Sequence, residues 1–578
     1  MAKRTGTAHV VTTTRKYKNR VYRTHLLRRS YREDGKVKNE TLGNLSHLPE
    51  PLIDIIRRSL QGETFVPVAS AFEVLNSRSH GPVQAVAQAM QRLGFAALIA
   101  SKPSRQRDLV CAMVAARIIA PQTKLATTRW WHTTTLAEHF RVTDATEDEL
   151  YAAMDWLLAG QGRIQKKLAA RHLHEGSLVL YDLSSSYFEG KTCPLVQRGY
   201  SRDGKKGKPQ VNYGLLTDAR GCPVAVSVYP GNTADPQTLM PEIDRLRHDF
   251  GIAQLVMVGD RGMITHKAIE VLREQEGIDW IAALKSGAIR ALMDQGQLQL
   301  GLFDERNLFE FTQPDYPGER LVACRNPQLA ALRAHKREDL LQATEKNLEK
   351  VRAMVQTGRL RGQDKIGLRV GTVINQYKVA KHFTLDIQDR SFAFQRQLER
   401  IAAEAALDGI YVIRTSLPAT RMAAEDCVRH YKSLTQVERA FRTLKSIDLR
   451  IRPIHHRLAD RVRAHIFLCM LAYYVEWYLR EVWRELLFAD TDQAAKATRD
   501  PVAPARRSAA AERKASTRTL EDGTAAHSFA TLLNELSTIV RNTCRTPHAG
   551  PDTNTFEVVT TANPKQRRAL ELIKSIQV

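Results

Sequence analysis

Cysteine is scarce in this 578-residue chain and is never closely paired. The seven cysteines lie at positions 111, 193, 222, 324, 427, 469 and 544, and no two of them are two residues apart. The chain therefore has no zinc-knuckle spacing and no evident disulfide framework. Such cysteine usage is typical of a reducing compartment, so we expect the protein in the cytoplasm.

Long apolar runs are missing as well. The most apolar stretch, 465–479, is shorter than the roughly 20 residues that cross a bilayer, and it contains Glu476. It predicts a buried core helix, and we expect no membrane partner. Near the N-terminus, the apolar segment 8–12 is too short for the hydrophobic part of a signal peptide.

Acidic residues are few relative to basic ones. The chain has 86 Lys and Arg against 62 Asp and Glu, a net charge of +24 and a pI of about 9.8. Residues 1–40 hold twelve Lys or Arg against three Asp or Glu, with Tyr17, Tyr22 and Tyr31 between them. A merely basic protein is one interpretation, but this clustering favours a nucleic-acid partner over a membrane surface.

The length predicts two to four domains. Hydrophobic periodicity predicts an α/β protein whose mixed sheet is flanked by helices. We expect a basic β-hairpin unit at 1–48 with a turn at Asp34-Gly35, a helical region at 49–175, and the two parts of the sheet domain at 176–286 and 406–488. Between those parts lies an expected insertion, 287–405. A disordered linker at 489–526 and a helical tail at 527–578 complete the expected order.

Three carboxylates occupy unusual positions in this pattern. Asp182 lies within an apolar strand, Asp260 ends another strand, and Glu438 lies on a later helix. An unpaired charge in an apolar strand costs several kcal/mol, which a bound cation would offset. Each residue alone also has an ordinary explanation. Asp182 could bond to the serines at 184–186, Asp260 could cap the turn before Gly262, and Glu438 could pair with Arg442.

The segment 431–445 predicts a helix that carries functional groups on one face. Tyr431, Glu438 and Lys445 are spaced seven residues apart. Seven residues are almost two helical turns, so the three side chains drift by only about 20° per step. A carboxylate between a phenol and an ammonium suits the binding of a metal ion against a phosphodiester.

Phosphodiester cleavage fits this set of residues. Two divalent ions about 3.5–4 Å apart activate the attacking oxygen and neutralise the leaving oxygen, and carboxylates hold them. Mg²⁺ prefers oxygen ligands and keeps several waters, so three carboxylates suffice. We therefore expect Asp182, Asp260 and Glu438 to hold Mg²⁺, with Mn²⁺ as a substitute, and we expect no other cofactor.

The chain resembles the insertion-sequence DDE transposases of the RNase H-like superfamily, in the branch with a Tyr-Arg-Glu-Lys signature helix. The resemblance spans about 145–485 and rests on three motifs, which are the segments 181–190, 259–263 and 431–445. It implies that Asp182, Asp260 and Glu438 form the catalytic, metal-binding triad. It also implies that Tyr431 and Lys445 contact phosphate, and that an insertion separates the fifth strand from the Glu438 helix.

One position departs from that signature. The family has Arg three residues after the signature tyrosine, whereas this chain has Leu434. Arg442 follows Glu438 by four residues and precedes Lys445 by three, so we expect it to take over the phosphate contact. Arg439 is a weaker candidate because it points about 100° away.

The resemblance implies a transposase that cleaves the ends of an insertion sequence and joins their 3′ hydroxyls to target DNA. Its expected partners are terminal inverted repeats, target DNA and a second copy of the chain on paired ends, in the bacterial cytoplasm near the nucleoid. The basic front, about 1–150, is expected to bind the repeats. Two alternatives are a nuclease of the same superfamily that only cleaves, and an inactive DNA-binding repressor of the element.

Overall fold

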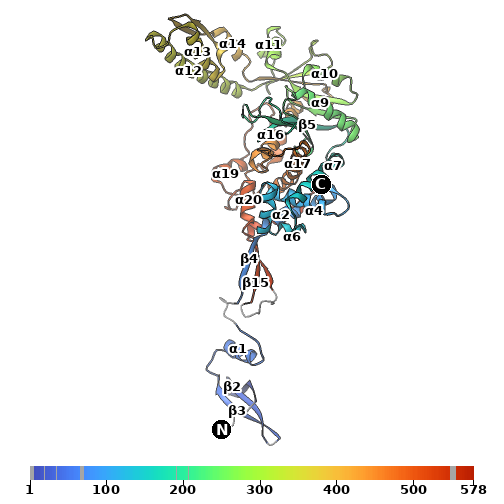
Figure 1. Ribbon diagram of the computed structural model, residues 1–578, viewed down its shortest axis with the longest axis vertical. Helices are drawn as coiled ribbons and strands as arrows, with labels where there is room; N and C mark the ends of the chain where they lie inside the picture. The colour runs from blue at the N-terminus through green and yellow to red at the C-terminus, as the bar shows by residue number, and fades with distance from the viewer. Residues whose placement is uncertain are drawn as a thin grey trace. The chain divides into compact units, whose positions relative to one another are not determined.

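The computed structural model describes residues 6–18, 20–33, 35–65, 71–190, 192–205, 207–546 and 555–578. The chain divides into two units (Figure 1). The smaller unit combines residues 1–77 with residues 541–559, and the larger unit holds the rest. Each unit is described by itself below.

The smaller unit begins with a three-stranded antiparallel sheet. It contains β1 (Thr7–Tyr17), β2 (Arg20–Glu33) and β3 (Lys36–Asn44) in that order, and α1 (Glu50–Leu60) packs against β1. Glu33 pairs with Lys36 across the second hairpin. The front of the chain is therefore a β unit, with one strand more than a single hairpin. Asp34, half of the expected turn, lies outside the described residues.

A second sheet in the smaller unit joins distant parts of the chain. Its order is β16 (Phe556–Val559), β15 (Val540–Arg545) and β4 (Glu73–Ser79). The expected helical tail at 527–578 therefore differs from the structure, in which helices α20 (Phe529–Leu536) and α21 (Pro564–Leu572) flank two strands. The partner strand β4 lies more than 450 residues upstream, beyond the reach of local patterns.

The larger unit opens with helices from Gly81 onward, whereas the first part of the region 49–175, expected to be helical, belongs to the smaller unit and includes strand β4. The helices of the larger unit here are α2 (Gly81–Arg92), α3 (Phe95–Ile99), α4 (Arg105–Ile119), α5 (Lys124–Trp130), α6 (Leu136–His139), α7 (Glu147–Ala159) and α8 (Gln161–His172). Thr146 and Glu149 form a capping box at the start of α7. Helices α2, α4 and α7 pack around the later helix α17 (Ala459–Val482).

The main sheet carries the strands predicted from the apolar runs. Its elements are β5 (Ser177–Tyr187), β6 (Gln210–Thr217), β7 (Pro223–Pro230), α9 (Asp235–Asp244), β8 (Leu255–Val258), α10 (His266–Arg273) and β9 (Ile278–Ala283). In space the strands run β7-β6-β5-β8-β9. Strand β6 is antiparallel to both neighbours, whereas β8 is parallel to β5 and to β9. This mixed sheet flanked by helices confirms the predicted fold class.

Three further strands extend the sheet beyond β9. They are β14 (Ile410–Thr415), β11 (Arg320–Arg325) and β10 (Leu308–Phe311), all antiparallel to their neighbours. Helix α11 (Ser286–Asp294) packs on β14. The first part of the expected insertion, 287–325, therefore enlarges the sheet.

The remaining part of the insertion has a hydrophobic core of its own. It contains α12 (Pro327–Gln356), α13 (Gln363–Tyr377), β12 (Phe383–Ile387), β13 (Phe392–Arg396) and α14 (Leu398–Ala405). Leu341, Leu348, Val351 and Val355 of α12 form much of that core.

Short 3₁₀ or π turns complete the secondary structure outside the active-site region. They lie at Trp131–Thr133, Arg245–Asp249, Leu300–Leu302, Ala380–His382 and Ile573–Ser575.

The apolar stretch 465–479 forms the buried centre of α17, as predicted, and every residue in it is buried. Within the described part of the chain, no single helix is long and apolar enough to cross a membrane. One bent pair, Arg105–Ile119 with Lys124–Thr133, passes that test by length and composition only.

The segment 489–526 is folded, so the expectation of a disordered linker is wrong. It contains α18 (Gln493–Thr498) and α19 (Ala509–Thr517). The buried ammonium of Lys514 donates hydrogen bonds to the carbonyls of Arg484, Leu487 and Ala489 at 3.1–3.2 Å. These polar contacts, together with Val502 and Leu520 buried in the main core, hold the segment in place without a regular apolar period.

Candidate active site

Strand register brings Asp182 and Asp260 together. Leu180 of β5 pairs with Val258 of the parallel strand β8. Asp182 lies two residues beyond that pair on β5, and Asp260 lies two residues beyond it in the turn that follows β8, so both carboxylates lie near the same end of these two strands. Two carboxylates on neighbouring strands repel each other unless a cation lies between them.

The electrostatics of Asp182 show this crowding. Burial and the charge of Asp260 raise the pKa of Asp182 to about 7, and the charge of Arg202 opposes the rise. The Asp182 Oδ1 accepts a hydrogen bond from the backbone N–H of Leu183 at 2.8 Å. Its Oδ2 accepts no hydrogen bond from any residue that the structure describes, including the serines at 184–186.

Asp260 is held by a tight turn that follows β8. Its Oδ1 accepts the backbone N–H groups of Gly262 at 2.9 Å and Met263 at 2.8 Å. Asp260 therefore does cap this turn, as the ordinary explanation expects. The turn uses one oxygen only, and Oδ2 has no hydrogen-bond donor within the described ranges. This oxygen is left for a ligand.

Glu438 lies on α16 (Leu434–Arg442), which packs against β5 through its apolar face. Leu434, Val437, Ala440 and Phe441 are buried on that face. The ring of Phe441 meets the ring of Tyr213 on β6 edge to face, with centroids 5.7 Å apart. Glu438 itself is exposed, and it forms no ion pair with Arg442 or any other described residue.

Tyr431 links the three carboxylates electrostatically. Burial raises the pKa of the Tyr431 phenol to about 12, and the negative charges of Asp260, Glu438 and Asp182 add to the rise. The charge of Arg261 opposes it. The phenol therefore lies within electrostatic range of all three carboxylates, although two of them are 256 positions apart in the sequence (182 to 438).

The single helix expected over 431–445 is wrong. Tyr431 ends α15 (Ala424–Lys432), Ser433 breaks the helix, and Glu438 lies on α16. Thr443–Ile447 then form a π-helical turn. A π turn takes up an additional residue, so Lys445 no longer shares the face of Glu438.

Lys445 is buried and ion-paired instead of facing the carboxylates. Its Nζ lies 3.1 Å from Oδ1 of Asp203, which also pairs with Arg452. Burial lowers the pKa of Lys445, whereas Asp203 raises it. Asp203 accepts the backbone N–H of Tyr187 as well, at 3.0 Å. The lysine therefore anchors the loop between β5 and β6.

That loop brings Arg202 to the carboxylates. The backbone N–H of Arg202 donates to the Ser185 hydroxyl of β5 at 3.1 Å, and its guanidinium pairs with Asp235. Its charge lowers the pKa of Asp182. Local sequence patterns give Arg202 no role, because the anchor at Asp203 depends on residues more than 240 positions away.

Two further guanidinium groups beside the carboxylates have no ion-pair partner in the described part of the chain. Arg442 and Arg261 are exposed, and the charge of Arg261 lowers the pKa of Tyr431. Arg439 is exposed too, but its charge interacts with Tyr473 of α17. Burial raises the pKa of the Tyr473 phenol, and the positive charge of Arg439 opposes that rise. Arg439 therefore faces α17 rather than the carboxylates.

Leu434, which replaces the arginine of the family signature, is only 9% exposed and belongs to the main core. We expect Leu434→Arg to destabilise the protein by about 3 kcal/mol, because it buries an unpaired charge. The neighbouring Thr435→Arg, at an exposed site, should change stability by less than about 0.5 kcal/mol. Thermal unfolding of both variants measures the difference, and equal midpoints would show that position 434 accepts a charge.

Among the described residues, one set of three metal-ligating side chains has its ligand atoms within 4.8 Å of one another, namely His172, Asp218 and Cys222. The oxygens of Asp182, Asp260 and Glu438 do not all lie within 4.8 Å of one another. A site for two ions spaced 3.5–4 Å apart does not require them to, since each ion binds only some of the carboxylates.

Two family models match the chain. Residues 184–475 match the family model described as the transposase DDE domain, a stretch that contains Asp260 and Glu438 and begins two residues after Asp182. Residues 10–65 match the N-terminal domain of the IS1634 family transposases. No curated protein matches the chain. One solved structure, a piggyBac transposase synaptic complex with hairpin DNA, is 8% identical with a TM-score of 0.35, and the alignment covers 78% of this chain and 77% of that one.

Proposed function

This chain belongs to the DDE transposase family, and we propose that it cleaves the ends of an insertion sequence and joins their 3′ hydroxyls to target DNA. The observation that carries the proposal is the closeness of Asp182 on β5 to Asp260 in the turn after the parallel strand β8, with Glu438 in electrostatic range of the same Tyr431 phenol as both aspartates. We propose these three carboxylates as the catalytic residues.

The residues present fit divalent metal ions. Asp182 and Asp260 each keep one carboxylate oxygen without a protein donor, and Glu438 keeps both. Oxygen donors of this kind suit Mg²⁺, and Mn²⁺ can substitute for it. When bound, such ions would activate the attacking oxygen and neutralise the leaving oxygen.

The surrounding side chains would position the DNA strand. Arg202, Arg261 and Arg442 supply positive charge at the edge of the carboxylates, where guanidinium groups can bind a phosphate in bidentate fashion. Tyr431 would donate its hydroxyl hydrogen to a phosphate oxygen, since its pKa near 12 keeps the phenol protonated at neutral pH. Lys445 acts indirectly in this proposal, by fixing Asp203 and the loop that carries Arg202.

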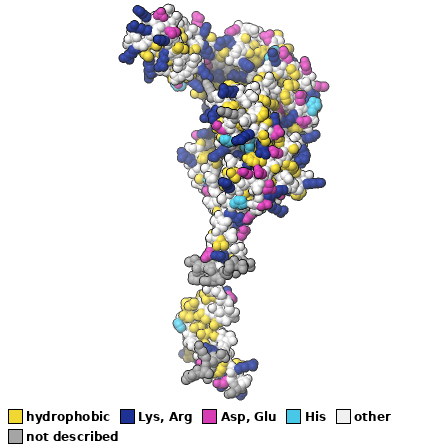
Figure 2. Space-filling view, in the orientation of Figure 1, with side chains coloured by type: hydrophobic (Ala, Val, Ile, Leu, Met, Phe, Trp, Pro, Cys, Tyr) yellow, Lys and Arg dark blue, Asp and Glu magenta, His cyan; other side chains and the backbone are white. Residues whose placement is uncertain are grey.

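Basic surface elsewhere in the larger unit offers further contacts for double-stranded DNA. Residues 327–405 contain 15 Lys or Arg against nine Asp or Glu, and Figure 2 shows Lys and Arg side chains gathered over this part. Arg361, Lys365 and Arg369 are exposed at a spacing of four, and none pairs with a described carboxylate. We propose a homodimer on paired ends, acting on DNA in the bacterial cytoplasm.

The pKa of Asp182 gives a test that needs no DNA. The carboxyl titrates near 3.8 in the unfolded chain and near 7 in the folded one, so between these values the folded state binds one more proton. Stability of the metal-free protein should therefore fall as the pH rises from 4 to above 7, by roughly 2–4 kcal/mol from this group. Thermal unfolding in EDTA at pH 5 and pH 8 should show a smaller loss in Asp182→Asn. An equal loss of stability between pH 5 and pH 8 in the wild type and in Asp182→Asn would contradict the raised pKa of Asp182.

The proposed activity is tested with DNA that carries the inverted repeats flanking the gene. The full-length protein with Mg²⁺ should nick the repeat ends and join them to a second duplex, and EDTA should stop both steps. Cleavage without joining would favour the nuclease that only cleaves. Specific binding without cleavage would favour the repressor, and either result would overturn the proposal.

A further inference from the structure

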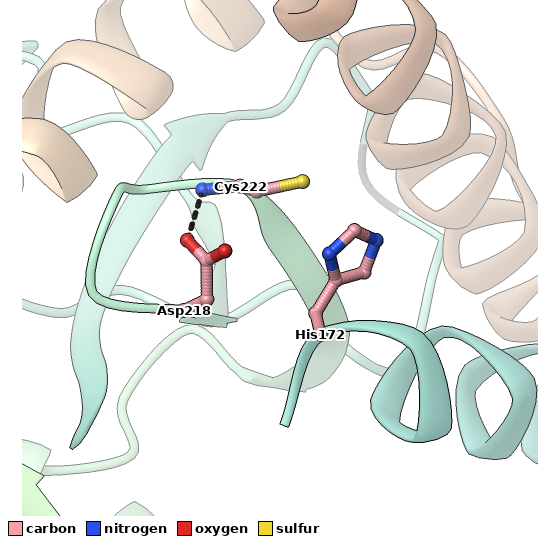
Figure 3. A group of neighbouring side chains, drawn as sticks. All are labelled: His172, Asp218 and Cys222. Carbon is pink, nitrogen blue, oxygen red and sulfur yellow. Dashed lines mark hydrogen bonds between the residues drawn. The ribbon is translucent and has the colours of Figure 1, made fainter. Parts of the chain in front are cut away.

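A second group of metal-binding side chains lies outside the carboxylates described above. One atom each of His172, Asp218 and Cys222 lies within 4.8 Å of the other two. His172 ends α8, while Asp218 and Cys222 flank the turn between β6 and β7. Figure 3 shows the imidazole of His172 beside the Cys222 side chain, with Asp218 next to both.

The other contacts of His172 and Cys222 leave a ligand atom available on each side chain, whereas both oxygens of Asp218 have partners. His172 Nε2 forms a hydrogen bond with the Tyr474 hydroxyl at 3.2 Å, which leaves Nδ1 for a metal. An outer hydrogen bond of this kind orients a metal-binding histidine. The Cys222 thiol is fully buried and has no hydrogen-bond partner among the described residues. Asp218 Oδ1 accepts the backbone N–H groups of Arg220 and Cys222, both at 2.9 Å.

A turn without a metal explains only part of this arrangement. The hydrogen bonds of Asp218 Oδ1, together with the ion pair between Oδ2 and Arg220 at 2.8 Å, stabilise the hairpin turn. They give no reason for a buried thiol and an imidazole nitrogen to approach the same carboxylate. Arg220 is 62% exposed and can share Oδ2 with an ion or move aside.

We propose that His172, Asp218 and Cys222 bind one Zn²⁺ ion, separate in place and in chemistry from the carboxylate site. Mixed nitrogen, oxygen and sulfur donors suit zinc, whereas Mg²⁺ prefers oxygen alone. On binding, the S–H bond of Cys222 breaks, a zinc–sulfur bond forms, and the proton passes to solvent. The thiolate and the carboxylate then balance the two charges of the ion.

The turn that the zinc would fix supports α16. Gly221, between the two hairpin ligands, has φ +85°, and a Cβ there would lie 2.6 Å from the Cβ of Gln436. Gln436 precedes Glu438 by two residues on the same helix. The ion would therefore stiffen the surface on which the Glu438 helix rests, so its role is structural.

The test uses untagged full-length protein without DNA, so its outcome is independent of the proposed transposition. After dialysis against Zn²⁺ and then metal-free buffer, elemental analysis should find about one zinc per chain. Cys222→Ser and His172→Gln should lose it. Cys544→Ser, which removes a buried cysteine in the smaller unit, should keep it.

The absorption spectrum of bound Co²⁺ gives a second test, which does not depend on how well the protein retains zinc during dialysis. Co²⁺ added to the wild-type protein should give a thiolate-to-cobalt absorption band that is missing in Cys222→Ser and present in Cys544→Ser. Zn²⁺ should also raise the thermal unfolding midpoint of the wild type but not of Cys222→Ser. A wild-type protein that retains no zinc and shows no thiolate band would overturn the proposal. A band that persists in Cys222→Ser would overturn it as well.

Discussion

Asp260→Asn is expected to reduce end cleavage about 10³-fold or more while leaving DNA affinity nearly unchanged. Losing one carboxylate removes metal-dependent stabilisation worth several kcal/mol, and about 4 kcal/mol corresponds to that factor. The asparagine oxygen can still accept the N–H groups of Gly262 and Met263, so the turn after β8 should persist. Single-turnover cleavage in saturating Mg²⁺ and a binding assay in Ca²⁺ measure the two quantities.

The matched control is Glu270→Gln, which removes the same charge from an exposed site on α10. It should cleave at nearly the wild-type rate. Asp260→Asn with a rate within tenfold of wild type would remove Asp260 from the catalytic triad.

Neutralising the tip of the first hairpin is expected to weaken end binding steeply at low salt. Arg15 and Lys16 of β1 lie opposite Tyr22 and Val21, and Arg20 lies opposite Tyr17. The three basic residues are exposed, as are the two tyrosines. If each contacts a phosphate, the triple alanine variant should reduce the slope of log K against log salt by about 2.7, at about 0.9 per contact.

Affinity of the wild type should itself fall roughly 10³- to 10⁵-fold between 50 and 200 mM salt, as for six to ten phosphate contacts. A triple alanine variant at Arg506, Arg507 and Arg518, which are exposed in the larger unit, removes the same charge and serves as the control. If both variants keep the wild-type slope, the hairpin does not bind DNA. If both reduce it equally, the effect comes from net charge alone.

Local patterns predicted the sheet well because its strands are buried on both sides. The apolar runs around Leu180, Val224 and Val258 could only be strands of an internal sheet, and their order along the chain matched the RNase H-like arrangement. The positions of Asp182 and Asp260 follow from that register. The comparisons confirm the DDE transposase family, whereas the Tyr-Arg-Glu-Lys branch and the triad assignment stay predictions.

Contacts between distant residues explain what the sequence analysis missed. The pairing of Lys445 with Asp203 and the π turn at 443–447 change the face on which Lys445 lies, and seven-residue spacing cannot reveal either. Leu434 is buried by packing that no local pattern shows. The group of His172, Asp218 and Cys222 has no zinc-knuckle spacing in the sequence, and the fold alone brings His172 to the other two residues.

Anomalous diffraction from crystals of the protein with end DNA and Mn²⁺ tests the central claim most directly. The account predicts manganese peaks within bonding distance of the Asp182 and Asp260 carboxylates, with Glu438 completing the site, and no such peaks in Asp260→Asn. A cleavage-competent complex whose manganese peaks lie away from these three carboxylates would contradict it.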